Sequence, residues 1–266
     1  MGLFGRSFEK PGPGVNKDEP RKKGAARFFE LLGRDFWDLI KLNLLFCICV
    51  IPTVGAFVMG FIGFYPGAAF IIALVLAYPV GGAVVAYVYY ITKMMRDDPS
   101  YVWYEFKRKF KENFRQAAPA GMLCTAFVYA QVLLWAGLII GEPGRDAIWF
   151  FIALLSLLIF GMITPYIFLH FAYIELNTFG VVKNSILLSF GYLPRSLVGA
   201  VLGGIMWIVT ALFFPVSLVL LPVIVLAGIS ISTLLCLMWV WPPFDNHFKI
   251  EETLIKRLEE EESEPD

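Results

Sequence analysis

Four long windows of the sequence contain no charged residue, and they limit the fold more than any other feature. They cover residues 42–92, 117–140, 147–174 and 196–244. Each is longer than the roughly 20 apolar residues that cross a bilayer as a helix. The whole chain has 17% charged residues, whereas soluble domains carry about 25%. The windows predict an all-α, polytopic membrane protein embedded in the lipid bilayer, and they argue against nucleic acid as a partner.

Two of these windows are too long for a single helix and contain turn signals. The first is divided by GFYPG (Gly63–Gly67), and the last by FFPVS (Phe213–Ser217). Glycine and proline next to aromatic residues are typical of tight turns. The sequence therefore predicts six transmembrane helices, at about 40–62, 68–92, 118–140, 147–174, 197–215 and 218–241.

The distribution of basic residues gives this six-span prediction an orientation. Of the 22 lysine and arginine residues, only Arg145 would lie on the outer side. Because cytoplasmic loops are enriched in lysine and arginine, we expect both termini in the cytoplasm and three hairpins closed on the outer side. Residues 24–248 then form the membrane domain, between a disordered tail (1–23) and an acidic tail (249–266).

A basic, aromatic segment lies between the second and third predicted spans. Its basic residues are Lys107, Arg108, Lys109, Lys111 and Arg115. In a helix, its aromatic residues share one stripe, formed by Trp103, Phe106, Phe110 and Phe114. This pattern predicts an amphipathic interfacial helix on the cytoplasmic side, with aromatic rings in the membrane and cations at anionic headgroups. Two interpretations stay open: a topological anchor, or a docking surface for a cytoplasmic partner.

A similar amphipathic pattern precedes the first span. Over Ala26–Asn43 one face collects Phe28, Leu32, Phe36 and Leu39. We therefore expect a second interfacial helix that leads into the first span.

Polar residues within a membrane span are candidates for function. The fourth predicted span has the best set, with spacings of four, three and four: Tyr166, His170, Tyr173 and Asn177. Such a stripe could line a cavity and bind a hydroxylated solute. The alternative is that these groups hydrogen-bond to neighbouring helices inside the bundle.

Signatures of enzymes and metal sites are missing from the sequence. It has no glycine-rich phosphate loop, no HExxH motif and no Cys/His cluster. All four cysteines fall in the apolar windows, so we expect no disulfide. Pro242-Pro243 predicts the end of the last span, and His247 beside Asp245 does not make a site. We expect no enzyme activity, no metal and no cofactor.

Three segments resemble the YesL-like family of bacterial integral membrane proteins. They are LNLL (Leu42–Leu45), YYITKMMRDDPSYVWYEFKRKFKENFRQA (Tyr89–Ala117) and KNSILLSFGYLPRSL (Lys183–Leu197). The resemblance runs from about residue 27 to about residue 248, and Tyr89–Ala117 is its most specific part.

The resemblance implies a location and a biological setting more than a chemistry. It implies a multi-pass protein of the bacterial cytoplasmic membrane, from a family that is a domain of unknown function. The genes of this family often neighbour those of carbohydrate ABC uptake systems. We therefore expect a non-enzymatic accessory component of such uptake, with permease subunits as partners. The alternative is a small-solute transporter or channel, and the sequence leaves a homo-oligomer open.

Overall fold

The computed structural model describes residues 21–63, 65–98, 100–140, 146–174, 176–212 and 224–263, and within them it contains helices and no strand. The first six helices are α1 (Gly24–Arg34), α2 (Phe36–Ile62), α3 (Pro66–Leu76), α4 (Tyr78–Met95), α5 (Val102–Asn113) and α6 (Ala118–Ile140). The others are α7 (Asp146–Tyr173), α8 (Thr178–Gly191), α9 (Leu193–Leu212), the π-helical turn η1 (Ile224–Gly228), α11 (Ile229–Phe248) and α12 (Ile250–Ser263).

The described helices are those of an all-α membrane protein. Four stretches are long and apolar enough to cross a bilayer, namely Phe36–Gly60, Ala118–Leu138, Ala147–Tyr173 and Leu226–Phe248. Two bent pairs raise the number to as many as six. Helices α3 and α4 meet at an angle of 50°, and α8 and α9 meet at 102°.

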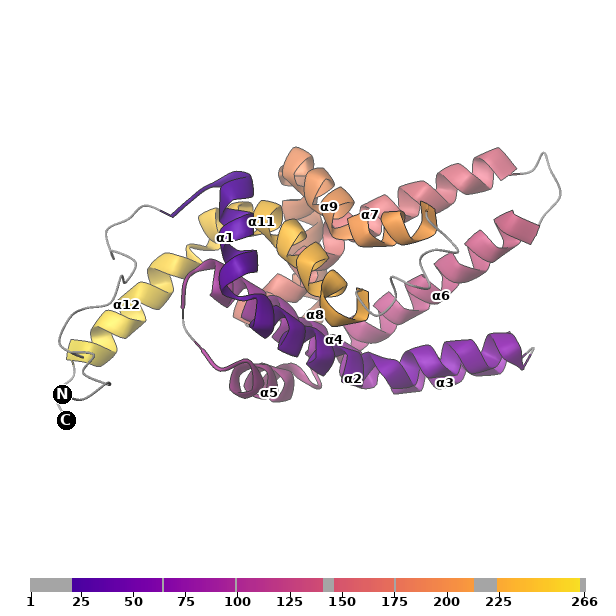
Figure 1. Ribbon diagram of the computed structural model, residues 1–266, viewed down its shortest axis with the longest axis horizontal. Coiled ribbons are helices and arrows are strands. Elements are labelled where there is room, and N and C mark those ends of the chain that lie inside the picture. Colours follow the sequence, from indigo (N-terminus) through magenta and orange to yellow (C-terminus); the bar gives the residue numbers. More distant parts are fainter. Residues whose placement is uncertain are drawn as a thin grey trace, which may run out of the picture.

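The helices divide the molecule into two ends (Figure 1). The connected ends of α2 and α3 lie at the lower right of the view, and those of α6 and α7 lie at the upper right. Helices α1, α5 and α12 lie toward the opposite end. Large apolar side chains are exposed along α2, α3 and the first half of α7. This is the surface that a bilayer would cover.

Helix α4 is the centre of the core, and 13 of its 18 residues are buried. A glycine pair lets neighbouring backbones approach it closely. A Cβ atom on Gly81 would lie 1.9 Å from the carbonyl oxygen of Ala117, at the start of α6. A Cβ atom on Gly82 would lie 3.2 Å from the carbonyl oxygen of Phe110 on α5. Small residues at such crossings allow the backbone contact that membrane helices use for packing.

Several expectations change in the structure. The predicted acidic tail contains a helix, α12, and the buried side chain of Ile250 fixes its start. Helix α11 continues through Pro242-Pro243 to Phe248, so this proline pair does not end it. The predicted turn at 213–217, Arg145 and the first 20 residues of the predicted disordered tail lie outside the described residues. Arg21, at the end of that tail, pairs with Asp97 and Glu251.

The apolar stripes of the two predicted interfacial helices face the protein in part, whereas Trp103 and Phe36 are exposed. Phe106 is buried in the main core, and Phe110 packs against the same cluster. Phe28 and Leu32 of α1 also pack on this core. The periodicity located some of the buried residues on each helix, but Phe36 and Leu39 of the second stripe belong to α2. Protein covers the buried side chains because α1 and α5 fold back onto neighbouring helices.

Candidate functional site

An arginine cluster holds α1 against the end of α4. Arg27 and Arg34, two turns apart on α1, both bond the carboxylate of Asp97. The Nη2 atom of Arg27 lies 2.6 Å from Asp97 Oδ2. Burial raises the pKa of Asp97, but the hydrogen bonds from Arg27 and Arg34 outweigh it, so this pKa lies below its ordinary value. Asp97 has a φ of 61°, the left-handed conformation that reverses the chain after α4.

A second ion cluster joins α4 to α5. The Nζ atom of Lys93 lies 2.8 Å from Glu105 Oε1, and both side chains are almost fully buried. Arg108 bonds the other carboxylate oxygen of Glu105 and the hydroxyl of Tyr89. Burial raises the pKa of Glu105, but the hydrogen bonds from Lys93 and Arg108 lower it by more, so this pKa lies below its ordinary value. The cluster holds the start of α5 against the end of α4, and the two helices run antiparallel, since Gly82 near the start of α4 faces Phe110 near the end of α5.

A buried hydroxyl network ties α4 to α2 and α11. The hydroxyl of Tyr87 lies 3.0 Å from Asn43 Oδ1 and 2.7 Å from Ser230 Oγ. Ser230 donates to the carbonyl oxygen of Leu39 at 2.8 Å. Asn43, the polar residue of the LNLL segment, therefore has a structural role.

An aromatic cluster surrounds the guanidinium of Arg96, at the end of α4. Its central carbon lies 5.4 Å from the ring centre of Tyr173 and 5.7 Å from that of Trp241. These distances are typical of cation–π contacts. The hydroxyl of Tyr173 bonds Thr92. The polar residues of the segment Tyr89–Ala117 thus connect α4 with α1, α5, α7 and α11.

Two residues of the polar stripe predicted for the fourth span are packed inside the protein. Tyr166 and His170 have no exposed surface. Tyr166 bonds Ser196 of α9, and His170 bonds Ser185 of α8. Helix α7 ends at Tyr173, and Asn177 instead caps α8 by accepting from the backbone N–H of Gly180. Asn177 is therefore not on the same helical stripe.

The five basic residues predicted for lipid or partner contact divide into two groups. Arg108 and Lys109 turn toward α4 and contact the ring of Tyr89, and Lys109 also pairs with Glu112. Lys107, Lys111 and Arg115 are exposed.

Two large aromatic residues share this exposed side of α5. Trp103 is 63% exposed and Tyr104 is 64% exposed. Together with Lys107 and Lys111 they form what we call the outward face of α5. Spacings of three, four and seven residues bring these side chains together. Sequence reasoning assigned Trp103 to the phenylalanine stripe, whereas the structure groups it with the lysines.

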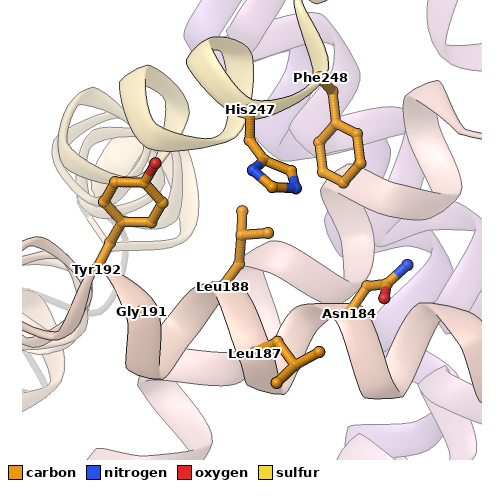
Figure 2. Close-up of a pocket in the computed structure, with 7 residues that line it drawn as sticks. All are labelled: Asn184, Leu187, Leu188, Gly191, Tyr192, His247 and Phe248. Carbon is orange, nitrogen blue, oxygen red and sulfur yellow. The ribbon is translucent and has the colours of Figure 1, made fainter.

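Two cavities lie where α11 passes into α12. The first, of about 290 Å³, is lined by Asn184, Leu187, Leu188, Gly191, Tyr192, His247 and Phe248. His247 projects from the end of α11 toward Leu188 on α8 (Figure 2). The second cavity, of about 250 Å³, is lined by Tyr173, Ile174, Phe248, Ile250, Thr253 and Leu254. Of the predicted stripe, Tyr173 lines the second cavity, whereas Tyr166 and His170 line neither.

The comparisons with known proteins add no relative. No protein-family model matches the chain, and neither does any curated protein or solved structure. The resemblance to the YesL-like family therefore rests on the sequence segments alone and stays a prediction. Among the residues that the structure describes, no three His, Cys, Asp or Glu side chains come together as a possible metal site.

Proposed function

We propose that the chain is a six-span protein of the bacterial cytoplasmic membrane, with both termini in the cytoplasm. The distribution of basic residues supports this orientation, because 21 of the 22 lysine and arginine residues would lie on the inner side. The arrangement of α1, α5 and α12 opposite the hairpin ends is consistent with it (Figure 1). In this topology the bent pair α3–α4 supplies one span, and α9, which is bent by 102° from α8, supplies another.

The activity that we propose is that of a non-enzymatic accessory component, which docks a partner through the outward face of α5. The observation that carries this proposal is the division of α5 into two faces. Phe106 and Phe110 are already covered by the core, so α5 needs no lipid to bury these two rings. Trp103, Tyr104, Lys107 and Lys111 nevertheless remain exposed. Exposed aromatic residues beside cations are typical of binding surfaces, where tryptophan and tyrosine contribute most of the energy.

The partner class comes from the family resemblance, which makes the permease subunits of a carbohydrate ABC-type uptake system the first candidates. Anionic lipid headgroups would also attract Lys107 and Lys111. The two differ in what the aromatic side chains do. A protein partner needs a fitted surface around Trp103, whereas a headgroup layer responds mainly to charge.

Two residues of the predicted stripe do not support the transport alternative, although Tyr173 lines the second cavity. A solute pathway requires polar groups that face a water-accessible cavity. Tyr166 and His170 are instead fully buried and bonded to neighbouring helices.

Co-extraction in lipid discs tests the accessory role. The tagged protein is extracted from its own membrane, and co-extracted permease subunits are quantified by mass spectrometry. Replacing Trp103 with serine should remove most of the bound subunit, since the loss of a buried aromatic anchor costs about 2 kcal/mol or more, which is about 30-fold in affinity. Lys107→Gln with Lys111→Gln should weaken binding and make it less dependent on salt.

A matched control neutralises two exposed lysines elsewhere. Lys249 and Lys256, at α12, have side chains that are 71% and 64% exposed. Their replacement by glutamine should leave co-extraction unchanged. Equal loss of co-extraction in the two lysine variants would mean that bulk charge governs binding. Unchanged co-extraction with the Trp103→Ser variant would contradict docking through α5.

A further inference from the structure

Phe248 links the two cavities at the α11–α12 junction. Its side chain lines the cavity of about 290 Å³ on one side and the cavity of about 250 Å³ on the other. The next residue, Lys249, has a φ of 52°, the left-handed conformation in which the chain turns from α11 into α12. The side chain of Phe248 therefore stands between the two spaces. The larger cavity is already close to the lower limit of about 300 Å³ for ligand pockets.

The same phenylalanine covers a buried histidine. The ring centres of His170 and Phe248 are 5.2 Å apart, and the rings are nearly perpendicular. The Nδ1 atom of His170 lies 2.7 Å from the carbonyl oxygen of Tyr166. A carbonyl oxygen only accepts, so this contact favours the neutral tautomer with the proton on Nδ1, which also lies 3.0 Å from Ser185 Oγ, and with a lone pair on Nε2. This Nε2 atom is buried and has no hydrogen-bond partner within the described part of the chain.

The linings restrict the charge of a ligand. Of the residues that the structure describes, no carboxylate, lysine or arginine lines either cavity. The polar groups are the side chains of Asn184, His247 and Tyr192 in the first cavity and those of Tyr173 and Thr253 in the second. Most of the other side chains are aliphatic or aromatic. Such a lining suits an uncharged, largely apolar molecule with few hydrogen-bonding groups.

The surroundings of the first cavity indicate where such a molecule would come from. Leu187, on its edge, is 61% exposed and belongs to an apolar side of α8 that also includes Phe179 and Phe190. Helix α8 is bent by 102° from α9. If α9 spans the bilayer, α8 lies close to the membrane plane with this apolar side toward lipid. A molecule dissolved in the bilayer could therefore enter past Leu187.

We propose that the two cavities form one binding site, closed at its middle by Phe248, for a neutral long-chain alcohol taken from the membrane. The hydroxyl of the alcohol donates to Nε2 of His170 once Phe248 has turned away, and the chain occupies the apolar lining. The site is separate from the outward face of α5, so it adds a small-molecule input to the proposed docking role.

Photolabelling with a matched pair of probes tests this site. The protein in lipid discs is irradiated with dodecanol that carries a diazirine, or with the methyl ether of the same molecule, which cannot donate. We expect labels on residues 184–192 and 244–254, with the alcohol preferred over the ether by about five- to tenfold, the value of one net hydrogen bond. The variant His170→Leu should label equally with both probes, and Leu188→Trp should lose labelling by both.

Two results would overturn the proposal. One is equal labelling by alcohol and ether in the unaltered protein, a comparison that does not depend on any variant folding. The other is labelling confined to the exposed apolar surfaces of α2 and α7, which would mean that the probes only report contact with lipid.

Discussion

The buried ion pair between Lys93 and Glu105 gives the sharpest prediction. In Glu105→Gln, Lys93 keeps a neutral acceptor and the more distant Asp98, whose carboxylate oxygen lies 3.5 Å away. Removing one partner of a buried pair costs about 3–5 kcal/mol. A hydrogen bond to a charged group contributes about 1.5–3 kcal/mol. Because glutamine retains an acceptor, we expect the lower range. The free energy required to open α5 away from α4 should fall by about 1.5–3 kcal/mol.

Hydrogen exchange measured by mass spectrometry in lipid discs reads this loss directly. Each 1.4 kcal/mol changes the opening equilibrium constant tenfold, so the amides of α5 should exchange about 10- to 150-fold faster in Glu105→Gln than in the unaltered protein. Glu112→Gln is the control, because the Glu112 side chain is 45% exposed and its pairs are solvated. Its effect should stay below about 0.5 kcal/mol. Equal exchange in the two variants would refute the claim that the buried pair holds α5 on α4.

Three further predictions concern the contacts around α4. Gly81→Ala places a Cβ atom 1.9 Å from a backbone oxygen, so it should lower the free energy of unfolding in detergent by at least about 1–3 kcal/mol. Gly137→Ala is the control, because its Cβ atom meets no atom within 4 Å and should have little effect. Tyr87→Phe removes the hydroxyl that joins α2 to α11 and should cost about 1–3 kcal/mol in the same denaturant titration; no change would contradict the network. The pKa of Asp97 is lowered on folding, so its contribution is present above the unfolded value of about 3.9 and is lost as pH falls through the lower folded value. Asp97→Asn should therefore speed exchange in α1 at neutral pH, and the unaltered protein should show the same release of α1 only below about pH 4.

The membrane helices could be predicted from the sequence because bilayer thickness sets their length. The predicted span at 118–140 coincides with α6, Ala118–Ile140, and the predicted span at 147–174 differs from α7 by one residue at each end. The bend between α3 and α4 was not predicted. It falls at Ala77, just before Pro79, and the proline was a usable signal.

What covers each helix could not be predicted in the same way. Periodicity places Phe106 and Phe110 on one face of α5, but either lipid or protein can bury such a face. The bond between Arg27 and Asp97 joins residues that are 70 positions apart, and no local pattern reveals such a pairing. The prediction that Asn177 shares a stripe with Tyr173 was wrong for a different reason, because it assumed one continuous helix. Asn177-Thr178 is itself a helix-start signal, and it could have shown that α8 begins there.

The accessory role depends on contact between the outward face of α5 and a partner, so the most direct measurement is site-specific photocrosslinking in the native membrane. A photoreactive amino acid replaces Trp103 in one variant and Lys256 on α12 in the control. The proposal predicts a discrete crosslink from position 103 to a permease subunit, which is absent from position 256. Crosslinks from position 103 to lipid alone, or the same crosslinked species from both positions, would contradict it.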